Sequence, residues 1–294
     1  MKFNFKTRIK AALKSFVNPN PAPKTLIQKQ VVECSDFLEK KLLSHKNVLI
    51  TGAGRNIGRS IALEMAKQGA NIFFTDLSSE RCIELERELK AYPIQSQGWS
   101  SDISKQDDIE NLLKVLEERD IKIDILVNNV GINLGRKPVL EISAEEWQQT
   151  FNANVFGPLD LTRKIVRITI ERKIQGSIIF VTSIHQWQLG LWAHYSSSKA
   201  ALGMIIKELA VELAPRGIRV NGIAPGAIAE DEKGNPFVHD YTLLHRTTIN
   251  PEYIGRAAVY LASDYFSMFT TGTILNIDAG LSLYNYRISQ HFPQ

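Results

Sequence analysis

Residues 47–60 read NVLITGAGRNIGRS, and this stretch decides the fold. It opens with a short apolar run, Val48 to Ile50, which is typical of a buried parallel strand. Glycines follow as far as Gly58 and a helical pattern begins at Ile57, so the stretch predicts a strand, a tight turn and a helix. In such a turn, backbone N–H groups can approach a pyrophosphate closely, and the positive end of the helix favours its charge. The stretch indicates a dinucleotide site, or else a plain glycine-rich turn.

Apolar strand patterns and helical patterns alternate along the chain after this stretch. Such alternation is the sequence form of βαβ units, in which helices join parallel strands. We therefore predict an α/β fold with a doubly wound parallel sheet. The strands are expected near residues 47–50, 71–75, 94–98, 123–127, 177–182, 219–223 and 274–277.

The composition is typical of a cytoplasmic protein. The 294 residues are 44% hydrophobic, which is enough to bury a large core. The two cysteines, Cys34 and Cys82, are far apart in the sequence, so neither a disulfide framework nor a metal site is expected. No apolar run reaches the roughly 18 residues that a membrane span needs, and the N-terminus lacks a signal-peptide core.

The positive charge is concentrated at the N-terminus. Residues 1–46 hold ten of the 35 Lys and Arg residues but three of the 31 Asp and Glu residues, a net charge of +7. The total is +4, so the rest of the chain carries −3. Nucleic acid is therefore not expected as a partner, because affinity for the phosphate backbone comes from clustered Lys and Arg.

Residues 1–46 are expected to form a basic helical extension before a single domain over residues 47–294. In residues 1–17, apolar side chains recur at helical spacing beside lysines, which fits a helix on an anionic membrane surface or on a partner protein. A solvated leader with no partner is the alternative. Residues 18–24 hold three prolines and indicate a linker. A second amphipathic segment, residues 27–42, is expected to pack on the domain or on a neighbouring subunit.

The end of the second expected strand bears on the choice of cofactor. Asp76 lies 18 residues beyond Gly58, where a carboxylate can accept hydrogen bonds from the adenosine ribose and repel a 2′-phosphate. Arg55, inside the glycine turn, could instead pair with that phosphate, lie over the adenine or point into solvent. A buried carboxylate cannot move away from a 2′-phosphate, whereas Arg55 has other positions that it can take. The sequence therefore favours NAD over NADP.

Further motifs follow in a fixed order, and together they carry more information than any one alone. They are Thr51-Gly52 with Gly58, Asp102-Ile103, Asn128-Asn129-Val130-Gly131, Asn154, Ser183, Tyr195 with Lys199, Pro225-Gly226 and Asp278-Ala279-Gly280. With these elements the chain from Lys46 to Leu281 resembles the short-chain dehydrogenase/reductase family in its compact single-domain form. The resemblance implies a Rossmann-like sheet of about seven strands in the order 3-2-1-4-5-6-7.

The resemblance also implies roles for residues. The cofactor is expected to contact Gly52, Arg55, Asn56, Ile57, Gly58, Asp76, Asp102, Ile103, Asn129, Gly131, Tyr195, Lys199, Pro225, Gly226 and Ile228. Tyr195 is expected to exchange a proton with a small alcohol or ketone while hydride passes between the substrate carbon and nicotinamide C4. Ser183 would hold the reacting oxygen. Lys199 would bind the ribose, and Asn154 would position a water beside Lys199.

The spacing of Tyr195 and Lys199 explains how a phenol could act as a base. Four residues apart at a helix start, the two side chains share one face. Free tyrosine has a pKa near 10, about three units too high for a base at pH 7. A cation about 5 Å away at an effective dielectric of about 20 contributes roughly 3 kcal/mol, or about two units. We therefore expect Lys199 to lower the pKa of Tyr195.

Two departures from the family pattern stand out. Asn56 replaces the middle glycine of the turn, and asparagine tolerates the left-handed conformation better than other residues with a Cβ. Glu230 stands where the family often has a threonine that touches the cofactor. A carboxylate near the pyrophosphate is unfavourable, so we expect either that this loop is displaced or that Glu230 faces substrate or solvent.

The segment between Ser183 and Tyr195 is expected to line the substrate site together with residues 227–246. His185, Trp187 and Trp192 offer flat surfaces and polar groups that suit a polar ring such as a sugar. Alternatively, the tryptophans pack under the loop and touch no ligand.

A second class of function stays open in the sequence. A protein that binds NAD without turnover could act as a sensor or scaffold, recruited to a membrane or a partner by its basic tail. The intact Ser183, Tyr195 and Lys199 weigh against this. The resemblance further implies a homodimer or homotetramer.

Overall fold

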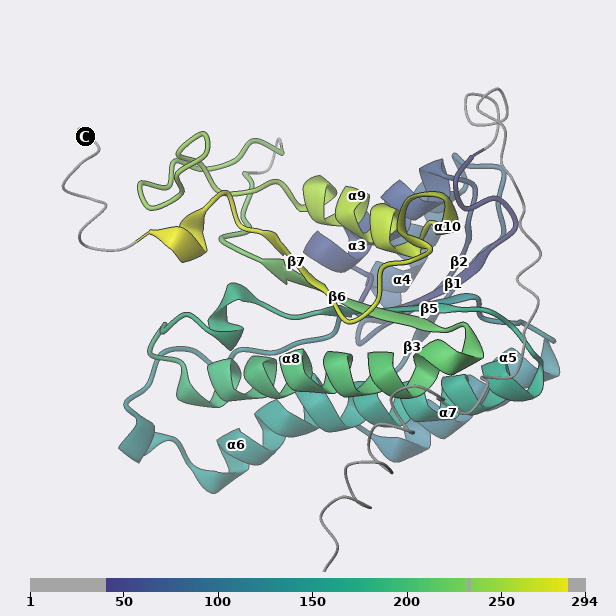
Figure 1. Ribbon diagram of the computed structural model, residues 1–294, viewed down its shortest axis with the longest axis horizontal. Helices are drawn as coiled ribbons and strands as arrows, with labels where there is room; N and C mark the ends of the chain where they lie inside the picture. Colours follow the sequence, from purple (N-terminus) through teal and green to yellow (C-terminus); the bar gives the residue numbers. More distant parts are fainter. Residues whose placement is uncertain (1–40, 232–233, 285–294) are drawn as a thin grey trace, which may run out of the picture.

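The computed structural model describes residues 41–231 and 234–284 (Figure 1). Its sheet has seven parallel strands in the order β3-β2-β1-β4-β5-β6-β7, which confirms the predicted fold and order. The strands are β1 (Asn47–Thr51), β2 (Asn71–Asp76), β3 (Ser96–Ser100), β4 (Ile125–Asn128), β5 (Ser177–Val181), β6 (Arg219–Pro225) and β7 (Ile274–Ile277). Each lies within two residues of its expected position.

Helices cover both faces of the sheet (Figure 1). They are α3 (Asn56–Lys67), α4 (Ser79–Leu89), α5 (Gln106–Glu118), α6 (Ala144–Phe151), α7 (Gly157–Glu171), α8 (Ala193–Leu213), α9 (Pro251–Ala262) and the short α10 (Asp264–Ser267). A π-helical turn, η2 (Asn152–Phe156), joins α6 to α7. Short 3₁₀ turns are η1 (Val139–Glu141), η3 (Ile184–Gln186), η4 (Ala214–Arg216) and η5 (Leu281–Leu283).

Successive residues of each strand face opposite layers, so one sheet supports two cores. In β1, Val48 and Ile50 pack with the buried residues of α3, α4 and α9, whereas Leu49 packs with those of α5, α7 and α8. Both faces of β1 are buried, which accounts for the continuous apolar run in its sequence. The chain leaves β1 toward β2 on one side, and β4 pairs on the other. The carboxyl ends of β1 and β4 therefore flank the crevice where such sheets bind ligands.

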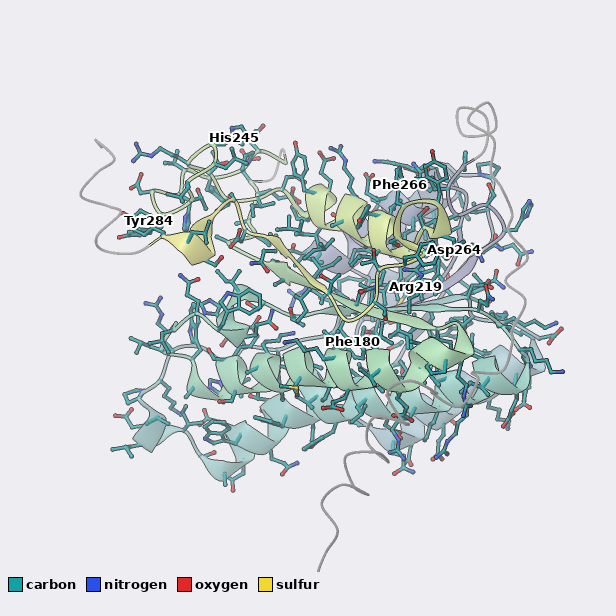
Figure 2. The ribbon with its side chains drawn as sticks, viewed as in Figure 1. Phe180, Arg219, His245, Asp264, Phe266 and Tyr284 are labelled. Carbon is teal, nitrogen blue, oxygen red and sulfur yellow. The ribbon has the colours of Figure 1, made fainter. Side chains whose placement is uncertain are left out.

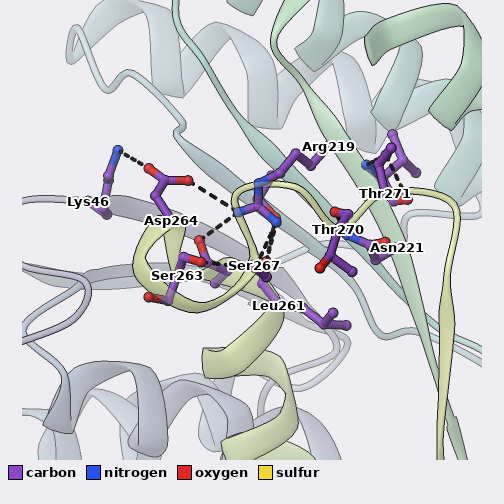
Figure 3. A network of polar contacts seen from close by, with 12 residues as sticks. Lys46, Arg219, Asn221, Leu261, Ser263, Asp264, Ser267, Thr270 and Thr271 are labelled. Atoms are coloured by element: carbon purple, nitrogen blue, oxygen red, sulfur yellow. Dashed lines mark hydrogen bonds and ion pairs between the residues drawn. The ribbon is translucent and has the colours of Figure 1, made fainter. Parts of the chain in front are cut away.

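A buried arginine anchors the start of β6 (Figure 3). The Arg219 guanidinium donates hydrogen bonds to the carbonyl oxygens of Leu261 at 2.7 Å and Ala262 at 3.0 Å, and to Ser267 Oγ at 2.9 Å. It also pairs with Asp264 at 3.3 Å. These contacts help to satisfy the last carbonyls of α9, and that of Leu261 also accepts from the hydroxyls of Ser177 and Ser267. Figure 2 places Arg219 and Asp264 far from His245 and Tyr284, which lie at the other end of the molecule.

Much of the predicted N-terminal extension, including residues 1–17, the linker at 18–24 and Cys34, lies outside the described residues. Within the described part of that region, Leu43 is buried in the core and Lys46 lies 3.7 Å from Asp264. The Cys82 thiol is free and buried, and burial raises its pKa to about 11. Among residues 41–231 and 234–284, no helix is both long and apolar enough to cross a membrane.

Candidate active site

The turn after β1 has the tight backbone that its glycines predict. Gly52 has a φ of +64° and Asn56 a φ of +47°, so both adopt the left-handed conformation. The expectation that asparagine replaces the middle glycine without loss of the turn is confirmed. A Cβ on Gly58 would lie 2.2 Å from the carbonyl oxygen of Gly52, so this close approach requires glycine.

The N-terminus of α3 is free to receive an anion. Arg55 at the N-cap makes no capping hydrogen bond with its side chain, and the first turn of α3 has no acidic residue. The N–H groups of that turn are therefore available, and the helix dipole favours a negative group there. The turn borders a pocket of about 480 Å³. A dinucleotide pyrophosphate fits this chemistry.

Most of the residues predicted to bind the cofactor line this one pocket. They are Gly52, Arg55, Asn56, Ile57, Gly58, Asp76, Asp102, Ile103, Asn129 and Gly131. The predicted residues Tyr195 and Lys199, both in α8, do not line it. Pro225, Gly226 and Ile228 do not line it either. They lie at and after the carboxyl end of β6, where Ile228 bridges Ile249 and a Cβ on Gly226 would meet the Asp278 backbone at 2.7 Å.

The Asp76 end of the pocket includes a cation that the sequence reading missed. Asp76 is buried, and its carboxylate accepts hydrogen bonds from the backbone N–H groups of Gly54 at 2.9 Å and Ser78 at 3.1 Å. Arg81, from the first turn of α4, forms an ion pair with the same carboxylate at 2.7 Å and also lines the pocket. In the sequence, Arg81 stands five residues after Asp76 at the start of a helix, and this spacing could have indicated that the two side chains meet. Part of the negative charge at this end is therefore compensated.

Asn129 fastens the end of β4 to the glycine turn. Its side-chain amide donates to the carbonyl oxygens of Thr51 at 3.0 Å and Gly52 at 2.9 Å, and its backbone N–H donates to Thr51 Oγ1 at 3.1 Å. These bonds hold two strand ends together, so they define the width of the crevice between β1 and β4.

Asn154 projects from the π-helical turn η2 and is fully buried. Its side chain makes a two-way link with Ile132, accepting from the backbone N–H at 2.7 Å and donating to the carbonyl oxygen at 3.0 Å. It also donates to Ser198 Oγ at 2.9 Å, and that hydroxyl in turn donates to the Tyr195 carbonyl oxygen at 2.7 Å. Asn154 therefore joins the loop after β4 to the first turns of α8. Ser198 is a positioning residue that the sequence reading did not name.

Lys199 lies in the interior beside the pocket. Its Nζ atom donates to the carbonyl oxygen of Val181 at 3.0 Å, and a Cβ on Gly131 would lie 2.8 Å from it. Because the ammonium group is buried, its pKa falls to about 8. This amine therefore adjoins the end of the pocket lined by Gly131.

Tyr195 lies beside Lys199, as the four-residue spacing predicts. The lysine Nζ atom is 5.7 Å from the centre of the tyrosine ring. The expected lowering of the tyrosine pKa is wrong for this structure, because burial raises the pKa of Tyr195 and the neighbouring Ser183 hydroxyl offsets part of the rise. Burying a phenolate costs free energy, and this cost raises the pKa whatever the attraction of a nearby cation contributes.

The segment after Ser183 places His185, one of the three expected substrate-site residues, next to Tyr195, and a second, Trp192, next to His185. The His185 ring lies 6.2 Å from the Tyr195 ring and 4.6 Å from the Trp192 ring, both edge to face. Trp187 is half exposed. Glu230 is exposed, in agreement with the expectation that it faces away from a pyrophosphate.

No cluster of three or more His, Cys, Asp or Glu side chains that could hold a metal ion occurs in the described part of the chain. Tyr195, Ser183 and Lys199 together offer a proton-carrying phenol, a hydroxyl and an amine, and the amine lies against the pocket at Gly131. Such a set can move a proton at an oxygen atom.

Comparison with known proteins identifies the family of this chain. The pattern of the short chain dehydrogenase family matches residues 46–236. The 3beta-hydroxysteroid dehydrogenase 1 of Eggerthella lenta is 34% identical over 253 residues, which are 82% of this chain and 95% of the relative. Glucose 1-dehydrogenase of Gluconobacter oxydans is 33% identical over 263 residues, 83% of this chain and 95% of the relative.

A solved structure has the same fold. A short-chain type dehydrogenase/reductase from Mycobacterium marinum superposes with a TM-score of 0.75 at 30% identity, over 83% of this chain and 98% of that one. The family match spans more than half of the chain, and the relatives are covered almost end to end. The chain therefore belongs to the short-chain dehydrogenase/reductase family of oxidoreductases, whose members bind nicotinamide cofactors.

Proposed function

We propose that this protein is an NAD-dependent oxidoreductase that interconverts a small alcohol and its carbonyl compound, with Tyr195 as the general acid and base. One observation carries the proposal. Lys199 lies against Gly131, which lines the pocket, and Tyr195 lies beside both Lys199 and the Ser183 hydroxyl.

The proton transfer belongs to Tyr195. Its phenol takes the proton of a substrate alcohol or gives one to a carbonyl oxygen, while the Ser183 hydroxyl holds that oxygen by a hydrogen bond. A nicotinamide cofactor, when bound, accepts or supplies the hydride. Tyr195 can act in both directions because the same group is regenerated when the reaction is reversed.

Lys199 and Asn154 support the phenol. The ammonium group of Lys199, 5.7 Å from the Tyr195 ring, favours the phenolate that forms when the proton leaves. Asn154 fixes the first turns of α8 through Ser198, which bonds to the Tyr195 backbone. Positioning of this kind reduces the entropy that the reaction must otherwise lose.

NAD is proposed over NADP because the buried Asp76 carboxylate would face an adenosine 2′-phosphate. The Arg81 ion pair at 2.7 Å offsets part of that repulsion. We therefore expect a modest preference for NAD, on the order of tenfold, which corresponds to about 1.4 kcal/mol.

The names of the relatives indicate the type of reaction but not a single substrate, since one is named for a hydroxysteroid and the other for glucose. Both names imply a secondary alcohol or hemiacetal as the reacting group, and we propose the same class here. By analogy with the family, we also expect a homo-oligomer, which light scattering of the purified protein would measure.

The test combines binding with turnover. Purified full-length protein is titrated with NAD and NADP by calorimetry, and alcohols and ketones are then screened by absorbance of the reduced cofactor. Tyr195→Phe is expected to keep cofactor affinity within twofold and to lower turnover by about 10³-fold. Tyr260→Phe, an exposed tyrosine on α9, is the matched control and should change neither value. Full turnover by Tyr195→Phe would show that the assignment is wrong.

A further inference from the structure

Arg136 lies at the end of a line of rings that leads to the proposed general acid. Its guanidinium carbon is 4.8 Å from the centre of the Trp192 ring. Trp192 meets His185 edge to face at 4.6 Å, and His185 meets Tyr195 in the same way at 6.2 Å. A cation from the loop after β4 is thereby held on the same side as the phenol, through aromatic contacts from the segment that carries Ser183.

The guanidinium of Arg136 has no carboxylate partner within ion-pair distance in residues 41–231 and 234–284. Its neighbour Lys137 differs, since its Nζ atom pairs with Glu146 at 2.8 Å. The two segments that build this corner, residues 129–140 and 183–199, contain no Asp or Glu. The corner therefore presents positive charge with no anion of its own to neutralise it.

The rings beneath Arg136 are held in place. A Cβ on Gly190 would lie 2.5 Å from both the His185 ring and the Trp192 ring, so the backbone of Gly190 packs closely against the two. The Nδ1 atom of His185 lies 3.2 Å from the carbonyl oxygen of Gln188. Burial, together with the charge of Arg136, lowers the pKa of His185, so His185 stays neutral near pH 7 and Arg136 is the cation of the corner.

A guanidinium stacked on an indole still has N–H groups along its edge, and these match the two oxygens of a carboxylate. We propose that Arg136 binds a carboxylate of the substrate, so that the protein acts on hydroxy acids and oxo acids. Because His185 and Trp192 lie between Arg136 and Tyr195, the carboxylate is several bonds away from the reacting carbon. The proposal rests on the proposed function, since it places the reacting oxygen at Tyr195.

The test compares acids with their neutral esters in a complex that cannot turn over. Full-length protein is saturated with whichever of NAD and NADP binds more tightly, in the oxidised form. It is then titrated by calorimetry with 3-oxobutanoate, 5-oxohexanoate and 6-oxoheptanoate and with the methyl ester of each. We expect at least one acid to bind ten- to a hundredfold more tightly than its ester, the range for a hydrogen bond to a charged group.

Three variants identify the residue responsible. Arg136→Gln should abolish the difference between acid and ester and leave cofactor affinity unchanged. Arg136→Lys should keep part of the difference in affinity between acid and ester, because the charge remains but the planar guanidinium is lost. Lys137→Gln, which removes the same charge one residue along, should keep all of it.

The proposal is overturned if no acid binds more tightly than its ester. It is also overturned if the advantage survives Arg136→Gln, or if Lys137→Gln removes it equally. Failure of the proposed function is read separately, from the cofactor titration and the turnover of Tyr195→Phe. A protein that binds NAD and turns over neutral ketones alone would keep that function and reject the role of Arg136.

Discussion

The amine of Lys199 donates a hydrogen bond to the backbone carbonyl of Val181 at 3.0 Å, and both residues are buried. Val181 ends β5, and Lys199 lies two turns into α8. The bond supplies one partner to an ammonium group that has three N–H donors. The charge is therefore held in the interior at a cost, which is visible in its pKa of about 8.

Lys199→Met is expected to stabilise the protein while it abolishes turnover. The drop in the Lys199 pKa from about 10.5 in the unfolded chain to about 8 means that the buried charge destabilises the folded protein by roughly 3 kcal/mol at pH 7. The variant also loses the hydrogen bond to Val181, which costs it about 1 kcal/mol. The net gain in the free energy of unfolding should be about 2 kcal/mol by urea denaturation. Lys207→Met, at an exposed site on the same helix, should change it by less than about 0.5 kcal/mol.

The same pair of proteins should differ in pH dependence. Between pH 8 and 10.5 the unfolded chain keeps the Lys199 proton that the folded chain has lost, so wild-type stability rises with pH across that window relative to the variant. Below pH 8 the stabilisation by Lys199→Met is complete, and it should shrink steadily toward pH 10.5. A difference that stays constant from pH 7 to 10 would contradict the burial of a charged amine.

Asp76→Asn and Arg81→Met should shift cofactor preference in opposite directions. The first removes a carboxylate and leaves Arg81 to face a 2′-phosphate, so NADP should gain about tenfold relative to NAD. Arg81→Met removes the ion pair from the Asp76 carboxylate and should weaken the binding of NADP further. The ratio of the two dissociation constants is the measurement, with Asp107→Asn on the exposed face of α5 as the control. Shifts in the same direction would mean that the ion pair does not set this preference.

Asn56→Ala should destabilise the protein by about 1 kcal/mol, because alanine lacks the tolerance of asparagine for a φ of +47°. Asn56→Gly should be neutral or slightly stabilising, since glycine adopts this conformation without strain. Asn111→Ala, an exposed site inside α5, should have the opposite sign because alanine is the better helix former there. Thermal unfolding of the three variants gives the comparison, and equal stability of Asn56→Ala and Asn56→Gly would argue against a strained turn.

Arg219→Met should lower the free energy of unfolding by about 3 kcal/mol. It takes a buried donor from the carbonyls of Leu261 and Ala262, and it leaves Asp264 with the longer ion pair to Lys46 at 3.7 Å. Arg256→Met removes an exposed arginine that pairs with Glu252 and should cost less than about 0.5 kcal/mol. Urea denaturation measures both, and similar values for the two would show that the Arg219 network adds little.

The sequence predicted the sheet well because its signals are local. Every strand is a short run of residues whose neighbours in the chain already mark its ends, and the glycine turn carries its own geometry at Gly52, Asn56 and Gly58. The motifs likewise placed Asn154, Ser183, Tyr195 and Lys199 in one region, and the packing of the chain brings these four together.

The features that the sequence did not predict arise from contacts between distant parts of the chain and from burial. The partner of Arg136 is fixed by how loops pack, and no spacing in the sequence marks it, whereas the spacing of Arg81 from Asp76 was a signal that the prediction did not use. The predicted direction of the Tyr195 pKa shift was wrong because burial of the phenol raises its pKa, and the hydrogen bond with Ser183 offsets only part of that rise. The π-helical turn that presents Asn154 also has no signal in an otherwise helical pattern.

The two ends of β6 serve different purposes. Arg219 secures the amino end to α9 and α10, and the segment that follows Pro225, which the sequence predicts to line the substrate site, leaves from the carboxyl end. That segment can therefore be lengthened, shortened or exchanged in evolution without disturbing the anchor of the last strands. The same separation makes it the natural place to graft loops from other oxidoreductases when a new substrate range is wanted.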